Sequence, residues 1–120
     1  KPFIYIRSSK KQHGRKNSIE GGFIKGQKVI VIEDLISTGM SSIKACNSVI
    51  ENQLELLGLV SIFTYGFIEA VNNFKNEKII NYSLSSYDYL IKEAVNMKKI
   101  DEKEINMLFS WKEDPKKWKF

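Results

Sequence analysis

The order of apolar and polar residues predicts a strand, a polar turn and a helix near the middle of the chain. Val29–Ile32 is a continuous β-branched run, which is typical of a strand covered on both faces in a parallel sheet, and it stops at Glu33-Asp34. A small polar segment at residues 37–42 follows. From Ile43 to Leu57 apolar side chains recur near helical spacing, so this stretch is predicted to be an amphipathic helix.

The same pattern continues downstream and indicates the fold class. Gly58 suits the position just past a helix end, and Leu59–Tyr65 is a second strand candidate, so the first three elements form one βαβ unit. We therefore predict a single α/β domain over residues 1–120, with a mainly parallel sheet flanked by helices. The further elements expected are a helix at 69–76, a strand at 79–84, a helix opened by a Ser85/Asp88 capping box and reaching about Met97, and a last helix from an Asp101/Glu104 capping box to about Phe109.

One long irregular stretch, residues 7–22, interrupts this regular pattern. Loops of that length inside compact domains are usually functional or disordered. Glycines at 14, 21 and 22 give it flexibility, and six basic residues crowd into it: Arg7, Lys10, Lys11, His13, Arg15 and Lys16.

Composition narrows the possible partners. The 120 residues are 42% hydrophobic and carry a net charge of +5, which favours anionic partners such as a polyphosphate, a membrane surface or nucleic acid. The single cysteine, Cys46, excludes an internal disulfide and a cysteine-cluster metal site, and is expected to be a small core residue. With no signal-like or membrane-length apolar segment, we expect a soluble, intracellular protein.

The polar turn has the chemistry of a phosphate site. Open α/β sheets place ligands at the carboxyl ends of their strands, and the free N–H groups and dipole of a following helix attract phosphate. Gly39 permits close backbone approach, and hydroxyls are supplied by Ser37, Thr38, Ser41 and Ser42. A phosphate monoester fits there, although a plain strand-to-helix turn with a polar cap would show a similar pattern.

Two adjacent carboxylates precede this turn and require a different ligand. Glu33 and Asp34 would repel a phosphate, whereas carboxylates accept hydrogen bonds strongly from a ribose diol one sugar away, and the pair could help to hold hydrated Mg²⁺. No Lys follows Gly39 and no GxGxxG is present, which argues against ATP hydrolysis and dinucleotide binding.

The segment Val31–Gly39, Val-Ile-Glu-Asp-Leu-Ile-Ser-Thr-Gly, resembles the phosphoribosyl diphosphate (PRPP) signature of type I phosphoribosyltransferases. The stretch from Tyr5 to Gly21 resembles the mobile catalytic loop of the orotate phosphoribosyltransferases. Residues 82–88 and 111–118 are similar to one bacterial subgroup of that family. The resemblance covers the chain as a carboxy-terminal part, because the family's amino-terminal hood over the base and its other pyrophosphate loop have no counterpart here.

This resemblance implies transfer of a phosphoribosyl group from PRPP to orotate, giving orotidine 5′-monophosphate and pyrophosphate with Mg²⁺ as cofactor, in a cytoplasmic homodimer. It assigns catalytic roles to Arg7, Lys11, His13 and Asp34, with Lys11 for the pyrophosphate and His13 for a hydrogen-bond or proton role. PRPP binding falls to residues 33–42, namely Glu33, Asp34, Ser37, Thr38, Gly39, Met40, Ser41 and Ser42. Ser37 also matches a position that touches orotate.

The chain departs from the family pattern at two points and leaves alternatives open. Ser8 stands where many members have Lys after the Arg, and Tyr65 stands near the place of a base-holding Arg. The acceptor could be another base. A non-catalytic regulatory or RNA-binding protein on the same fold is a further alternative, although no aromatic-rich RNA-binding motif is evident. The 120-residue chain by itself is expected to be inactive.

Overall fold

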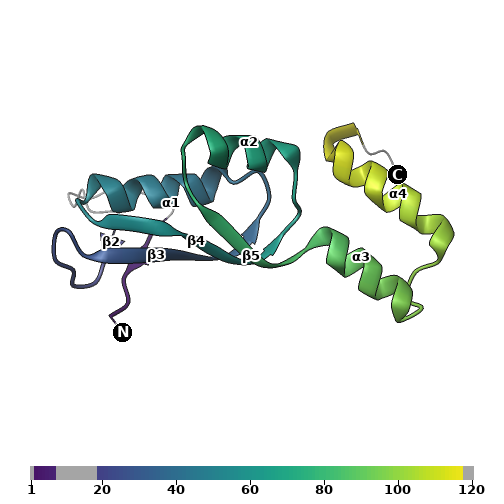
Figure 1. Cartoon of the computed structure of the whole chain (residues 1–120), viewed down its shortest axis with the longest axis horizontal. Coiled ribbons are helices and arrows are strands. Elements are labelled where there is room, and N and C mark those ends of the chain that lie inside the picture. The colour runs from purple at the N-terminus through teal and green to yellow at the C-terminus, as the bar shows by residue number, and fades with distance from the viewer. Residues whose placement is uncertain (1, 8–18, 118–120) are drawn as a thin grey trace.

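The computed structural model describes residues 2–7 and 19–117 and consists of a small parallel sheet with helices (Figure 1). A two-stranded antiparallel ribbon, in which Tyr5 pairs with Glu20 and Ile6 with Ile19, precedes the sheet. The elements are β1 (Tyr5–Ile6), β2 (Ile19–Glu20), β3 (Lys28–Ile36), α1 (Met40–Glu51), β4 (Glu55–Thr64), α2 (Ile68–Asn76), β5 (Asn81–Ser86), α3 (Tyr87–Asn96), α4 (Glu102–Glu113) and a 3₁₀ turn at Pro115–Lys117.

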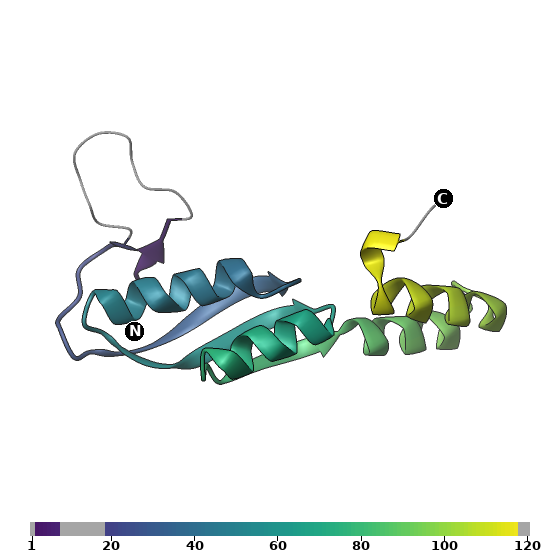
Figure 2. The same cartoon turned by 90° about the horizontal axis from the view of Figure 1, so that it is seen from above.

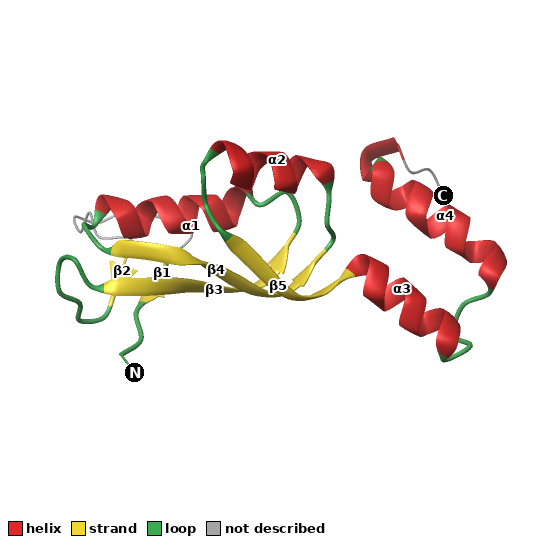
Figure 3. Ribbon diagram, viewed as in Figure 1, coloured by secondary structure: helices red, strands yellow, loops and turns green. Residues whose placement is uncertain are grey.

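The main sheet has the order β3-β4-β5, and both strand pairs are parallel, so the predicted α/β class with a parallel sheet is confirmed. Helices α1 and α2 lie side by side on one face of this sheet (Figure 3). The buried core lies between them and the strands and includes Val31, Ile36, Cys46, Leu59 and Phe74.

The opposite face of the sheet is open, so the prediction that the strand at Val29–Ile32 is covered on both faces is wrong for the described residues. Ile32 pairs through Val60 with Tyr82 across the three strands, and Ile32 and Tyr82 remain 66% and 68% exposed. Ile30, Ile62 and Leu84 are exposed as well. A β-branched run indicates that both faces of the strand prefer to be buried. Whether a face is covered depends on other residues that pack against it.

Two predicted boundaries in the βαβ unit are corrected. Helix α1 ends at Glu51 rather than near Leu57, because Gln53 has a positive φ of 61° that a helix cannot continue through. Gly58 is not a helix cap but lies inside β4, where it pairs with Ile30 at a register shift. A Cβ on Gly58 would stand 2.9 Å from the carbonyl oxygen of Ile80, so the backbones of β4 and β5 approach closely there.

Downstream elements exist as predicted, with shifted ends. The helix predicted at 69–76 is confirmed as α2, while the strand predicted at 79–84 is β5 at Asn81–Ser86. The Ser85/Asp88 capping box is wrong, because the strand runs through Ser86, which is itself the residue before α3. The second capping box is confirmed: the backbone N–H of Asp101 donates to Glu104 Oε2 at 2.8 Å, although α4 continues beyond Phe109 to Glu113.

Helices α3 and α4 form an antiparallel hairpin that projects beyond the end of the sheet (Figure 2). This projection explains a Cα radius of gyration of 17.6 Å, against about 14 Å for a compact chain of this length. None of the helices in the described part of the chain has the length and apolar character needed to cross a membrane.

An aromatic cluster attaches the hairpin to the sheet. The Trp111 ring lies 5.1 Å from Tyr87, 5.5 Å from Tyr65 and 5.8 Å from Phe67, measured between ring centroids. The hydroxyl of Tyr87 donates to the Leu108 carbonyl at 3.3 Å, and Lys112 pairs with Asp88 at 2.6 Å. The predicted structural role of Trp111 is confirmed, whereas Trp118 lies outside the described residues.

We expect Trp111→Ala to release the hairpin from the sheet. Losing three aromatic neighbours of a half-buried indole should cost about 3 kcal/mol of unfolding free energy, since each such pair is worth roughly 1 kcal/mol. Urea unfolding measures the loss, and hydrogen exchange of residues 102–113 locates it. Tyr89→Ala, on an aromatic that is 70% exposed in α3, is the control; equal losses for the two variants would contradict the prediction.

Candidate functional site: the loop between β3 and α1

The predicted phosphate loop is short and tightly shaped. Residues 33–36 of the predicted 33–42 loop belong to β3 and residues 40–42 to α1, so the loop itself is Ser37–Gly39. Gly39 has φ +80°, which L side chains rarely adopt, and its carbonyl accepts the Ile43 N–H at 2.9 Å as the first bond of α1. The first-turn N–H groups of the helix therefore start directly at the glycine.

The hydroxyl residues of this region lie in different environments. Ser37 and Ser41 are exposed, and Thr38 is half-buried, so these three are accessible to a ligand. Met40 is exposed at the first position of α1. Ser42, in contrast, is only 1% exposed, and its Oγ has no hydrogen-bond partner among the described residues. The structure thus places Ser37, Thr38 and Ser41 at the surface of the loop and Ser42 beneath it.

The two carboxylates do not occupy equivalent positions. Both lie inside β3, and successive residues of a strand point to opposite faces. Glu33 pairs with buried Ser61 and lies close enough to Cys46 of α1 to influence its ionisation. Asp34 is exposed, and its Oδ1 accepts the N–H of Leu35 at 2.7 Å. One carboxylate therefore faces the helix layer, while the other turns toward the backbone leading into the loop.

Cys46 is a buried residue, as predicted, and its thiol is inert at neutral pH. It is 0% exposed, and burial, followed by the negative charge of Glu33, raises its pKa from 9.0 to about 11. Because the folded-state pKa is raised, the protonated thiol stabilises the fold fully below pH 9, and this stabilisation is lost as the pH rises toward about 11.

We expect Cys46 to resist thiol reagents at about pH 8 in the folded chain and to react after unfolding. Glu33→Gln should lower the Cys46 pKa, since it removes the second cause of the shift, while Glu77→Gln on the exposed end of α2 should not. Labelling rates across pH 7–11 measure both effects. Rapid labelling of the folded wild type would contradict the burial of this side chain.

The basic segment is only partly within the described residues. Arg7 follows β1, and its guanidinium pairs with Glu20 of β2 at 2.6 Å. Residues 19 and 20, which the sequence placed in one irregular stretch from 7 to 22, form β2 instead. The β1–β2 ribbon therefore brackets the segment on both sides. Lys11 and His13, together with Ser8 and Lys10, lie outside the described residues.

Tyr65, which stands near the position of a base-holding Arg in the family pattern, is part of the aromatic cluster. Its ring stacks on Phe67 at 5.2 Å with an interplanar angle of 6°, and its backbone N–H donates to the Ile36 carbonyl at 3.0 Å. The backbone of Tyr65 therefore bonds to the end of β3, and its ring contacts Tyr87 and Trp111 of the α3–α4 hairpin.

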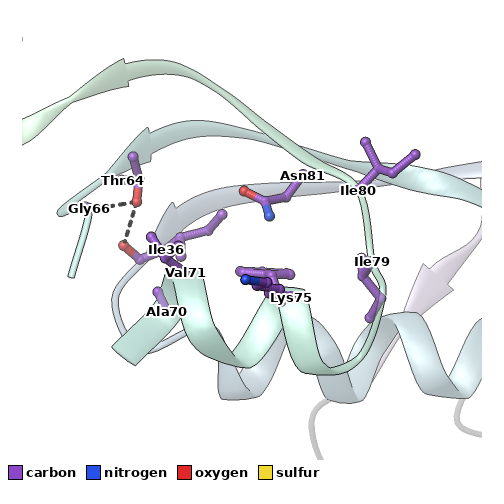
Figure 4. A pocket seen from close by; sticks show the side chains of 10 residues that line it. Ile36, Thr64, Gly66, Ala70, Val71, Lys75, Ile79, Ile80 and Asn81 are labelled. Carbon is purple, nitrogen blue, oxygen red and sulfur yellow. Dashed lines mark hydrogen bonds between the residues drawn. The ribbon is translucent and has the colours of Figure 1, made fainter. Parts of the chain in front are cut away.

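A cavity lies between α2 and the three strands (Figure 4). It has a volume of about 410 Å³ and does not include any residue of the 37–42 segment. Its lining is mostly apolar, with Lys75 and Asn81 as the polar groups, and Thr64 Oγ1 bridges the Gly66 N–H and the Ile36 carbonyl at its edge. The predicted phosphate loop is thus an open surface feature rather than this cavity.

Sequence reasoning missed two residues of α2 that contact the loop. Asn73 donates from Nδ2 to the Thr38 carbonyl at 2.9 Å, and the Phe74 ring lies against Gly39, where a Cβ would be 2.8 Å from Phe74 Cε2. A separation of 35 residues along the chain left no local signal for the first contact.

Solved structures define the class of protein. The chain matches the UMP synthase of Leishmania donovani with a TM-score of 0.72 and 22% identity, over 92% of this chain and 23% of that one. It matches the orotate phosphoribosyltransferase of Mycobacterium tuberculosis in complex with PRPP with a TM-score of 0.59 and 25% identity, over 71% of this chain and 47% of that one. The fold is that of a type I phosphoribosyltransferase, and the chain covers about half or less of each of the solved structures that it matches.

Sequence relatives narrow this class. The chain is 49% identical over 118 residues to the orotate phosphoribosyltransferase of Cytophaga hutchinsonii, and 46% identical over 113 residues to that of Staphylococcus aureus. These matches cover 98% and 94% of this chain, and the chain spans 56% of the length of each relative. No family model matches it. The chain belongs to the orotate phosphoribosyltransferase family.

Proposed function

We propose that the complete polypeptide containing this chain transfers the phosphoribosyl group of PRPP to orotate, forming orotidine 5′-monophosphate and pyrophosphate. The observation that carries the proposal is the Ser37–Gly39 loop between a carboxylate-bearing strand and a helix N-terminus, in a chain 49% identical to an orotate phosphoribosyltransferase. The solved complex of the M. tuberculosis relative with PRPP supports the choice of donor.

In this proposal the loop binds the 5′-phosphate of PRPP. The N–H groups opening α1 and the hydroxyls of Ser37, Thr38 and Ser41 donate to the phosphate oxygens, and the helix dipole adds to the attraction. Met40 contributes its backbone N–H, because its side chain points to solvent at the first helical position. The side chain of Ser42 is buried, so it is not counted among the hydroxyls that bind the phosphate.

The carboxylates serve the ribose. In this proposal Asp34 accepts hydrogen bonds from the ribose diol; its exposure and its position two residues before the end of β3 support this role. Glu33 acts beside it on the helix side, and the two carboxylates would help to hold hydrated Mg²⁺. The ion would neutralise charge on the departing pyrophosphate.

Bond cleavage at the anomeric carbon builds negative charge on pyrophosphate and positive charge on the sugar. Cations delivered at that moment stabilise the transition state, and a segment that covers the site excludes water from the sugar cation. We assign this role to Lys11, with Arg7 anchoring the segment and His13 in hydrogen bonding or proton transfer. We further propose that the segment reaches the neighbouring site of a homodimer and that the enzyme works in the cytoplasm.

The test is an assay of orotidine 5′-monophosphate formation by the complete polypeptide with orotate, PRPP and Mg²⁺. Hypoxanthine, adenine and uracil serve as rival acceptors, and the 120-residue chain alone is assayed in parallel and is expected to be inactive. Product with orotate alone supports the proposal. Turnover of another base would keep the donor and change the acceptor, whereas salt-dependent RNA binding without PRPP binding would favour a regulatory protein on the same fold.

A further inference from the structure

We propose that α2 positions the phosphate loop: Asn73 fixes the orientation of the peptide group between Thr38 and Gly39, and Phe74 fixes the place of Gly39. This inference rests on the proposed binding of the 5′-phosphate by Ser37–Gly39. It goes beyond that function by assigning a specific positioning role to residues that lie far from the loop in sequence.

The hydrogen bond from Asn73 acts on a particular peptide plane. Its Nδ2 donates to the Thr38 carbonyl at 2.9 Å in a half-buried setting. In a trans peptide the carbonyl of one residue and the N–H of the next point in opposite directions. Fixing the Thr38 carbonyl toward α2 therefore directs the Gly39 N–H away from α2. A donor held in this way needs no reorientation when an anion arrives.

Phe74 supplies the second constraint on the same loop. Its side chain is 2% exposed and belongs to the buried core, and its ring atoms Cε2, Cδ2 and Cζ lie 2.8, 3.3 and 3.4 Å from the position of a Cβ at Gly39. The ring therefore leaves no room for a Cβ at position 39, so only glycine fits there. Because Phe74 is packed in the core, its ring does not move with the loop.

Backbone hydrogen bonds close both ends of the helix that carries the two residues, and its buried side chains pack it into the core. The Val71 N–H donates to the Phe67 carbonyl at 3.2 Å at the start of α2, and the Ile79 N–H donates to the Phe74 carbonyl at 3.0 Å after its end. Ala70 and Phe74 are its two buried residues, whereas Asn72 is exposed. Asn72 and Asn73 thus form a natural pair of identical side chains, one facing solvent and one contacting the loop.

The experiment compares Asn73→Ala, Asn73→Asp and the matched control Asn72→Ala in the complete polypeptide. Equilibrium binding of PRPP, ribose 5-phosphate and Mg²⁺-pyrophosphate is measured separately, together with the KM for each substrate and the Tm. Ribose 5-phosphate reports on the loop, while pyrophosphate reports on the rest of the site.

We expect Asn73→Ala to weaken the binding of PRPP and of ribose 5-phosphate by the same factor. The factor should be about tenfold, because one hydrogen bond that orients a donor is lost. Binding of Mg²⁺-pyrophosphate, the KM for orotate at saturating PRPP, and all constants of Asn72→Ala should stay at wild-type values. Asn73→Asp should bind both phosphate ligands more weakly still, since it also adds a negative charge next to the loop.

Four results would overturn the inference. Wild-type affinity of Asn73→Ala for ribose 5-phosphate, even with a lower Tm, would show that the contact is structural only. If Asn73→Ala weakens Mg²⁺-pyrophosphate binding as much as ribose 5-phosphate binding, the variant damages the whole site. If Asn72→Ala has the same effects as Asn73→Ala, the contact with the loop is not their cause. If the wild type binds PRPP but transfers the phosphoribosyl group to another base, this inference stands and only the orotate assignment is refuted. If the wild type binds neither PRPP nor ribose 5-phosphate, both the inference and the proposed function are refuted.

Discussion

Gly39→Ala is expected to destabilise the chain by about 3 kcal/mol and to abolish PRPP binding by the complete polypeptide. Two costs add at this position. Forcing an L residue to φ +80° costs about 1–2 kcal/mol, and the new Cβ would lie 2.8 Å from Phe74 Cε2, a contact with a fully buried ring that forces repacking at roughly 1–3 kcal/mol. Either relaxation moves the first-turn N–H groups of α1, because the Ile43 N–H bonds to the Gly39 carbonyl.

Urea unfolding of the 120-residue chain and PRPP titration of the complete polypeptide measure the two effects. Gly22→Ala is the matched control, since no atom lies within 4 Å of a Cβ at that glycine and its φ is not positive. The double variant Gly39→Ala/Phe74→Leu should recover part of the stability, by relieving the contact but not the backbone strain. A stable Gly39→Ala protein with unchanged PRPP affinity would refute the loop geometry described above.

The parts of the fold that sequence predicted well are those governed by local signals. Helix α2 and the Asp101/Glu104 capping box depend on residues three or four positions apart, and the turn between β3 and α1 depends on a glycine placed between a β-branched run and an amphipathic stretch. Such patterns carry their physical cause within one window of the chain. The existence of each element was therefore predictable even where its ends were not.

The errors share the opposite property. Gly58 has the local appearance of a helix cap, yet only glycine fits there because the Ile80 carbonyl, directly before β5, approaches its backbone closely. The extension of β3 through Glu33 and Asp34 depends on the pairing of Glu33 and Leu35 with β4, which outweighs the low strand preference of acidic residues. Because these causes are tertiary contacts, no window of the sequence contains them.

The candidate site divides in the same way. Ser37, Thr38 and Gly39 were identified from the motif, but the different environments of Glu33 and Asp34 followed only from the strand that contains both. Asn73 and Phe74 belong to no motif, because an Asn that faces solvent and a Phe that faces the core are ordinary on an amphipathic helix. The positioning role proposed for them depends on their contacts with Thr38 and Gly39, which only the fold reveals.

Asp34→Asn and Lys11→Ala are expected to damage different steps in the complete polypeptide. Asp34→Asn removes a charged acceptor for the ribose diol, and hydrogen bonds to charged groups are worth about 1.5–3 kcal/mol, so the PRPP Kd should rise roughly tenfold to a hundredfold. Lys11→Ala removes a cation that acts on the pyrophosphate as charge develops, so kcat should fall about a hundredfold or more while the PRPP Kd changes less than about threefold.

Binding and single-turnover kinetics separate the two steps, and the chain offers a control for each variant. Lys25→Ala removes an exposed lysine outside the proposed site, and Glu77→Gln removes an exposed carboxylate at the end of α2; both should leave Kd and kcat unchanged. Because the diol is bound before the bond breaks and the pyrophosphate charge appears only during cleavage, ground-state and transition-state effects must separate. Equal turnover by the two variants, with equal PRPP affinity, would refute the division of roles between the carboxylate strand and the basic segment.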